Sequence, residues 1–342
     1  MTPRETAAVA PPSIFPERIL ACLKAPAADD DTNLVAAPDG FRCVETGEFF
    51  SFIEGVPSLY APSPGEGAEV TARVKSFYEE HPFPSYEGLE EFGELVAKGS
   101  QNPFSAKLLD AIGCNKTVLE CGCGTGQLTH FLQLSNNHVL GVDISLSSLR
   151  LAVEHKRRND LVRSAFAQMN IFDLAVKDNA FDVVIAHGVL HHTFDPRRAF
   201  AAVVRKLKPG GVVMIGLYNR YARIPTWLRS KIIGFTGGNI DYVVRNRIRD
   251  LRKAEIWIKD QYYNPHETWH SIGEVLQWFE ESGIDYLNCS PPILGTDGED
   301  AASLFQPTEA GDPYRRAVTQ LSWIATIARE GALFDMIGRK RA

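Results

Sequence analysis

Two histidines and a glutamate in the stretch HETWHSIG have the spacing H-E-x-x-H that opens a zinc metalloprotease signature. They are His266, Glu267 and His270. In such a site the two histidines, one helical turn apart, bind zinc and the glutamate activates a water molecule. The chain would then be a hydrolase, provided that both histidines lie on one helix.

The residues that follow this stretch disfavour a helix through both histidines. Ser271 and Glu274 have the S-x-x-E spacing of a capping box, which predicts that a helix begins only after His270. The extended protease signature also requires a histidine at position 276, where the chain has Leu276. We therefore expect no metal site here, and a zinc metalloprotease is a remote alternative.

A glycine-rich turn, VLECGCGTGQLT, indicates a different chemistry. Its glycines at 122, 124 and 126 let the backbone approach a ligand, and Asp143, at the end of the next apolar stretch, is placed to bond ribose hydroxyls. A dinucleotide-binding dehydrogenase would need glycine at 127, where the chain has Gln127. The acid at Glu120 suits a ligand with a cationic amino acid end. These residues predict a nucleoside-binding α/β fold.

The stretches LECGCGTG and GVDIS resemble motifs one and two of the class I S-adenosylmethionine-dependent methyltransferases. The resemblance continues through FDVV and LKPGG, and the final LFDMIGRK resembles the family's last strand. It implies a Rossmann-like, doubly wound α/β fold with a mostly parallel seven-stranded sheet. It also implies S-adenosylmethionine as the cofactor and methyl transfer to a small or carrier-linked acceptor, with a non-catalytic S-adenosylmethionine-binding protein as the alternative.

The resemblance also assigns a set of cofactor-binding residues. Asn170 stands where the family usually has an acid that contacts adenine, and its amide loses the charge but keeps hydrogen-bonding ability. The implied cofactor site comprises Glu120, Gly122, Gly124, Thr125, Gly126, Gln127, Asp143, Ile144, Asn170, Ile171, His187 and Gly188.

Methyl transfer from an activated sulfonium needs positioning and a base, and it needs no metal. In this fold the candidate residues follow the fourth and fifth strands, in HGVLHHT and LYNRY. The HETWH stretch precedes the helix that leads into the sixth strand, so it either binds the acceptor or forms a structural crossing. The predicted catalytic residues are His191, His192, Tyr218, Asn219, His266, Glu267 and His270.

The chain divides into segments of different composition. Residues 1–15 are rich in Ala and Pro and predict a disordered tail, and residues 63–113 predict a linker followed by N-terminal helices. Residues 16–62 predict a small β-rich module that resembles a zinc ribbon. Of the four sulfur ligands of such a ribbon only Cys22 and Cys43 are present, so we expect a degenerate module without zinc. The methyltransferase domain is expected over 114–342.

A helical insertion over the active site is predicted at 221–263, after the fifth strand. Between Arg220 and Asp260 the sequence has ten Lys or Arg and four acids, a local charge of +6. This excess either belongs to a solvated helical face or steers an anionic or carrier-linked substrate into the pocket.

The net charge of −6 argues against a nucleic-acid-binding surface. The chain has no signal-peptide pattern and no apolar run long enough for a transmembrane segment, so a cytoplasmic location is expected. Six irregularly spaced cysteines suit reduced thiols. Neither the methyl acceptor nor the oligomeric state follows from the sequence.

Overall fold

The structure is a computed structural model that describes residues 15–62, 65–236, 240–248, 250–294 and 304–342. Residues 1–14 of the predicted tail lie outside the described residues. Phe15, which we had placed in the tail, is buried and packs edge-on against Phe41 with ring centroids 5.2 Å apart. Among the described residues, no helix combines the length and the apolar character that a bilayer crossing requires.

A seven-stranded sheet forms the centre of the molecule, in the order β10-β11-β9-β8-β5-β6-β7. The neighbouring strands from β9 to β7 in this order pair in parallel. At the other edge, β11 pairs antiparallel with β9, and β10 pairs antiparallel with β11. The strands are β5 (Thr117–Cys121), β6 (His138–Asp143), β7 (Ser164–Gln168), β8 (Phe181–His187), β9 (Leu207–Tyr218), β10 (Ile284–Ser290) and β11 (Leu333–Lys340). The predicted mostly parallel, Rossmann-like sheet is confirmed.

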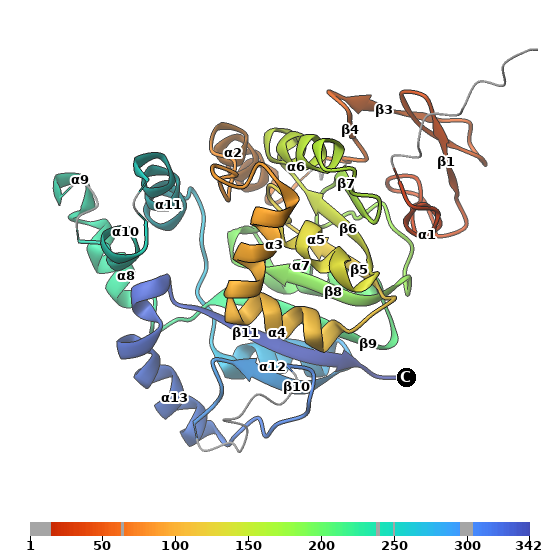
Figure 1. The fold of residues 1–342 in the computed structure, drawn as a ribbon. Helices are drawn as coiled ribbons and strands as arrows, with labels where there is room; N and C mark the ends of the chain where they lie inside the picture. The colour runs from red at the N-terminus through yellow and green to blue at the C-terminus, as the bar shows by residue number, and fades with distance from the viewer. Residues whose placement is uncertain (1–14, 63–64, 237–239, 249, 295–303) are drawn as a thin grey trace, which may run out of the picture.

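Helices cover both faces of this sheet because its strands are apolar on both sides. Val118 and Val183 face one layer of helices, which contains Leu108 and Phe131, whereas Leu119 and Val184 face the other. The first layer consists of α3 (Phe92–Gln101), α4 (Pro103–Ile112) and α5 (Gln127–Leu132). The second includes α7 (Pro196–Arg205), α12 (Ile272–Glu281) and α13 (Pro313–Thr326), and α6 (Leu146–Arg158) packs on β7 (Figure 1).

The N-terminal module is a second, four-stranded antiparallel sheet that follows the short helix α1 (Glu17–Leu20). Its strands are β1 (Leu34–Ala37), β2 (Gly40–Cys43), β3 (Phe49–Ile53) and β4 (Val56–Pro57). Backbone hydrogen bonds from Leu59 to Gln168 and from Lys24 to Ala175 attach it to the β7 edge of the large sheet. Cys22 and Cys43 are both buried free thiols. The likeness of this module to a zinc ribbon stays a prediction.

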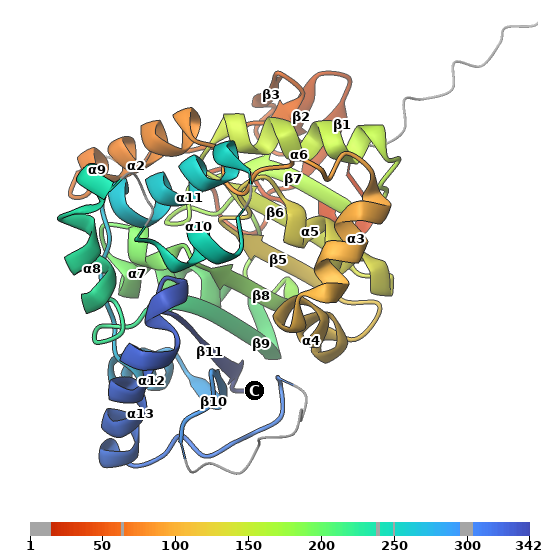
Figure 2. The same ribbon diagram turned by 60° about the vertical axis from the view of Figure 1, so that its left-hand side comes forward.

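Helices from two distant parts of the chain lie above the carboxyl ends of the parallel strands. One part is α2 (Ala68–Glu80), which precedes the sheet in sequence. The other follows β9 and contains α8 (Ile224–Ser230), α9 (Ile233–Thr236), α10 (Tyr242–Asn246) and α11 (Leu251–Tyr263). In Figure 2, α2 and α11 lie side by side, and the Tyr78 hydroxyl donates to Asp260 Oδ1 at 3.0 Å. The two parts therefore cover this end of the sheet together.

The helix α12 begins where the capping-box pattern predicts. Ser271 is its N-cap, and the side chains of Ser271 and Glu274 exchange hydrogen bonds with each other's backbone N–H. Residues 264–270 form no helix. His266 and His270 therefore do not share a helical turn, as expected.

Candidate functional site

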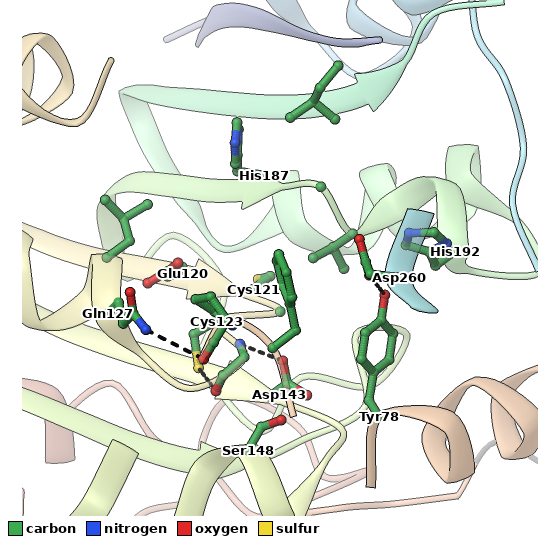
Figure 3. Close-up of a pocket in the computed structure, with 18 of the residues that line it drawn as sticks. Tyr78, Glu120, Cys121, Cys123, Gln127, Asp143, Ser148, His187, His192 and Asp260 are labelled. Carbon is green, nitrogen blue, oxygen red and sulfur yellow. Dashed lines mark hydrogen bonds between the residues drawn. The ribbon is translucent and has the colours of Figure 1, made fainter. Parts of the chain in front are cut away.

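A cavity of about 780 Å³ opens at the carboxyl ends of β5, β6, β8 and β9. This volume lies in the upper part of the range for small-molecule sites, and the position is the usual one for ligands of open parallel sheets. Figure 3 shows side chains from several elements pointing into it. Ten predicted cofactor residues line this cavity: Glu120, Gly122, Gly124, Gln127, Asp143, Ile144, Asn170, Ile171, His187 and Gly188.

The glycine turn after β5 adopts backbone angles that favour glycine. Gly122, Gly124 and Gly126 have φ values of 70°, 52° and 77°, which place them in the left-handed region. A Cβ added to Gly124 would lie 2.1 Å from the carbonyl oxygen of Phe83. Gly124 is thus needed where the chain segment around Phe83 crosses the turn, a role that the sequence analysis missed.

Thr125 and Gly126 lie behind the cavity wall. The Thr125 side chain is fully buried; its hydroxyl donates to Pro84 O at 2.7 Å and its backbone N–H donates to Phe83 O at 3.1 Å. Gly126 is the N-cap of α5, where a Cβ would contact the Phe166 ring at 2.5 Å. These two residues shape the turn without lining the cavity, and their predicted contact with the cofactor stays a prediction.

Asp143 ends β6 with its carboxylate at the cavity. One of its oxygens accepts a hydrogen bond from Gly124 N at 2.8 Å and the other accepts from Ser145 N at 2.9 Å. Burial raises the pKa of Asp143, and these backbone N–H groups oppose that effect. Each carboxylate oxygen keeps a second lone pair, so Asp143 can also accept from the hydroxyls of a bound ribose.

Glu120 and His187 form a buried, titratable part of the cavity wall. Burial raises the pKa of Glu120 to about 7, although the Thr129 hydroxyl donates to its carboxylate. For His187, burial lowers the pKa, but Asp335, whose Oδ1 lies 2.7 Å from Nδ1, raises it overall above its ordinary value. The His187 ring also stacks on Phe104, with centroids 5.0 Å apart. Neither Asp335 nor Phe104 was predicted from the sequence.

The His192 ring lines the cavity from η2 (Leu190–His192), the short helix after β8. Its Nδ1 lies 2.8 Å from the backbone carbonyl of His266, which can only accept. Nδ1 must therefore carry the proton, which leaves Nε2 of the neutral ring as a proton acceptor. Burial lowers the pKa of His192 below its ordinary value, so the neutral form predominates at pH 7.

A chain of polar side chains continues this wall from His192 toward α11. The Tyr78 hydroxyl donates to Asp260 Oδ1 at 3.0 Å, and Gln261 Nε2 donates to both Asp260 Oδ2 and the Tyr218 hydroxyl at 3.0 Å (Figure 3 shows the first bond). All four of these side chains line the cavity. Tyr218 was predicted as a catalytic residue, and the sequence also places Asp260 in a polar group before α12 that could bind the acceptor. Tyr78 and Gln261 were not predicted, because they come from helices whose position relative to the sheet the sequence does not specify.

Arg223 and Glu267 support this wall from outside the cavity. The buried guanidinium of Arg223 lies 3.7 Å from the centroid of the Tyr218 ring and donates to Gln261 Oε1 at 2.7 Å. It also donates to both carboxylate oxygens of Glu267, at 2.6 and 3.2 Å. Glu267 therefore fixes Arg223, which fixes Tyr218 and Gln261.

Five of the predicted catalytic residues, His191, Asn219, His266, Glu267 and His270, do not line the cavity in the part of the chain that the structure describes. The buried His191 ring packs on Tyr218 with centroids 3.9 Å apart. Asn219 Oδ1 accepts from the N–H groups of Tyr221 and Ala222 and turns the chain after β9. These contacts assign His191 and Asn219 to packing and to a turn.

Within HETWH, the structure favours a hydrogen-bonded crossing over an acceptor-binding loop. Thr268 N donates to His191 O, and His270 N donates to Tyr218 O, both at 2.8 Å. Both ring nitrogens of His270 are hydrogen-bonded, Nδ1 to the Glu274 carboxylate and Nε2 to the Thr268 hydroxyl. Among the described residues, no group of three or more His, Cys, Asp or Glu side chains is arranged to hold a metal ion. The absence of zinc stays a prediction.

Comparisons with known proteins find similarity to methyltransferases. Residues 112–281 match the family model described as a methyltransferase domain. An uncharacterised protein of Synechococcus sp. is 28% identical over 274 residues, which cover 70% of this chain and 63% of that protein. A ubiquinone biosynthesis O-methyltransferase of Methylococcus capsulatus is 28% identical over 196 residues, 56% of this chain and 74% of that enzyme. A solved methyltransferase of Thermotoga maritima aligns with a TM-score of 0.42 and 16% identity, over 78% of this chain and all of that one.

Proposed function

Because this chain belongs to the class I S-adenosylmethionine-dependent methyltransferases, we propose that it transfers a methyl group from S-adenosylmethionine to a hydroxyl oxygen of an acceptor with an apolar body. When bound, the cofactor supplies a methyl group on a sulfonium, which is already activated for displacement. The residues of this chain then have to hold the cofactor, position the acceptor and accept its proton.

The residues at the end of β5 and β6 fit this cofactor. The positive φ angles of the glycine turn leave an approach for a ligand along its backbone. Asp143 has lone pairs for ribose hydroxyls, and Asn170 and Ile171 follow β7 at the same cavity. Glu120 is a buried carboxyl group whose ionised form a nearby cation would stabilise. These residues would hold the nucleoside and the amino acid end of S-adenosylmethionine.

The single observation that carries the proposal is the hydrogen bond from His192 Nδ1 to the His266 carbonyl. It fixes the tautomer in which Nε2 bears a lone pair, on a ring that lines the cavity. Nε2 of His192 accepts the proton that the acceptor hydroxyl loses as its oxygen becomes nucleophilic. The relative from Methylococcus capsulatus, by its printed name an O-methyltransferase, supports oxygen as the methylated atom.

The cavity wall supports an uncharged acceptor with an apolar body. Val74, Val243, Trp257 and Leu333 contribute apolar surface, and Lys98 is the sole Lys or Arg among the described lining residues. Four of the ten cations counted between Arg220 and Asp260 are engaged elsewhere: Arg220, Arg223, Arg247 and Lys259 form ion pairs with glutamates. We therefore do not retain an anionic acceptor in the proposal.

The variant His192→Asn tests this assignment. Its amide keeps a donor for the His266 carbonyl but removes Nε2, so the methyl-transfer rate should fall by about 10²- to 10⁴-fold while cofactor affinity stays unchanged. Calorimetry with S-adenosylmethionine and the rate of transfer from labelled cofactor measure the two quantities. His266→Asn is the matched control, because its backbone carbonyl remains and its ring does not line the cavity. An active His192→Asn variant would contradict the assignment.

A further inference from the structure

The helix α8 and the residues next to it have a polar face toward the protein and an apolar face toward the surface. Arg223 and Thr226 face the protein with 1% and 2% of their surface exposed, whereas Trp227 and Leu228 are 46% and 55% exposed. The inward face is polar because it is hydrogen-bonded: Arg223 binds Glu267 and Gln261, and the Thr226 hydroxyl donates to Ala328 O. The apolar side chains of this segment are consequently left on the surface.

We define these outward side chains as the α8 ridge, which consists of Tyr221, Ile224, Trp227, Leu228 and Ile232. Within α8, Trp227 and Leu228 lie three and four residues after Ile224, which places these three side chains on one side of the helix. Tyr221 and Ile232 flank the helix in the chain. Figures 1 and 2 both show α8 at the outer edge of the molecule. A cluster of large apolar side chains at the surface, including a tryptophan, is typical of a docking surface rather than of a solvated face.

The exposed charge beside the α8 ridge is positive. From residue 221 to residue 236 the sequence contains no Asp or Glu. Of its three cations, Arg223 is buried against Glu267 and Arg229 donates to Thr226 and Ala328, which leaves Lys231 at the surface. Lys231 is exposed, and its ammonium lies 5.1 Å from the centroid of the Trp227 ring. An apolar ridge with a tryptophan and an exposed lysine beside it fits a segment that lies in the interface of an anionic membrane.

We propose that the α8 ridge docks this protein onto an anionic phospholipid surface. Trp227, Leu228 and Ile232 enter the boundary between headgroups and acyl chains, and Lys231 contacts lipid phosphates. A second copy of this chain is a weaker candidate for the occupant, because a twofold contact would bring the two Lys231 side chains toward each other. The proposal does not depend on the methyl acceptor or on catalysis.

Co-sedimentation of the full-length chain with vesicles, without cofactor, tests this proposal. The chain should bind vesicles of phosphatidylcholine mixed with phosphatidylglycerol, bind vesicles of phosphatidylcholine alone more weakly, and lose affinity as salt is added. Leu228→Glu should weaken binding at least about tenfold, because a charged side chain replaces one buried in the lipid boundary. Lys231→Glu should weaken binding to the anionic vesicles about fivefold or more.

Val162→Glu is the matched control, since Val162 is an equally apolar residue that is 68% exposed and lies outside the α8 ridge. It should bind vesicles like the unmodified chain, and thermal unfolding should show that all three variants are folded. Failure of the unmodified chain to bind either kind of vesicle would overturn the proposal, as would equal binding by Leu228→Glu. Concentration-dependent dimerisation that Leu228→Glu abolishes, without vesicle binding, would assign the ridge to a second copy instead.

Discussion

Glu120 is the residue whose ionisation should control cofactor binding. Its pKa is raised to about 7 by burial, and the ammonium group of S-adenosylmethionine favours the ionised carboxylate. Above pH 7 the carboxylate is already ionised, whereas below pH 7 binding must first release its proton. Cofactor affinity should therefore fall by up to about tenfold for each pH unit below this pKa. Calorimetric titrations at pH values on either side of 7 measure this slope.

The variant Glu120→Gln separates this explanation from a general loss of structure at low pH. The amide cannot ionise, so the variant should bind S-adenosylmethionine more weakly at neutral pH and show an affinity that hardly changes as the pH is lowered. A steep pH dependence that persists in Glu120→Gln would mean that another group titrates with binding. His187 would then be the next residue to test, because the pKa of its ring is also raised and it lines the same cavity.

At the scale of elements, the glycine turn after β5 is held by the segment that follows α2. Thr125 N and its hydroxyl donate to Phe83 O and Pro84 O, and Gln127 Nε2 donates to Ser85 O at 2.9 Å. In Gly124→Ala the new Cβ would approach Phe83 O within 2.1 Å at a φ of +52°, so the segment has to move. We expect a loss of cofactor affinity of about tenfold or more, measured by calorimetry, with a lowered melting temperature.

The matched substitution is Gly273→Ala in the first turn of α12. A Cβ at Gly273 meets nothing within 4 Å, and alanine favours the helix over glycine by roughly 0.5–1 kcal/mol. This variant should bind the cofactor normally and melt at a slightly higher temperature. Normal cofactor binding by Gly124→Ala would show that the crossing of Phe83 over the glycine turn has no part in forming the cofactor site.

The crossing formed by HETWH contributes to stability through the ion pair between Glu267 and Arg223. Arg223 is almost fully buried, so Glu267→Ala would leave its charge without a counterion. Removal of one partner of a buried pair costs about 3–5 kcal/mol, and we expect about 3 kcal/mol here because the Glu267 side chain is 24% exposed. Chemical denaturation measures the change. The double variant Arg223→Met, Glu267→Leu removes both charges but leaves the buried acceptors Gln261 Oε1 and Gly331 O without their donor, so it should recover only part of the loss. A loss well under 1 kcal/mol in Glu267→Ala would contradict this role.

At the scale of the whole molecule, the sequence predicts best what depends on neighbouring residues. The apolar strands, the glycine turn and Asp143 lie within about 30 residues of one another, and their order along the chain determines where they meet in a parallel sheet. The capping box of Ser271 and Glu274 is likewise local, and it was sufficient to show that His266 and His270 do not lie on one helix.

What the sequence could not predict is the part of the site that depends on how distant segments pack. Tyr78 and Phe104 precede the sheet, and Asp335 comes from the last strand, yet all three act at the cavity or on a residue that lines it. No periodicity in the chain indicates that α2 lies against α11. HETWH illustrates the converse: its side chains are of the right types for chemistry, but Glu267 and His270 are used to hold the crossing in place.

The central proposal is that this chain catalyses methyl transfer, and the most direct measurement uses S-adenosylmethionine labelled in its methyl group. The purified chain and labelled cofactor are incubated with a cell extract, and the products are separated by size and solubility. We predict that label moves into an extractable product with an apolar body, with one S-adenosylhomocysteine formed per labelled product, and that His192→Asn nearly abolishes this transfer. Cofactor binding without any transfer of label above that of the extract alone would contradict the account and would indicate a non-catalytic S-adenosylmethionine-binding protein.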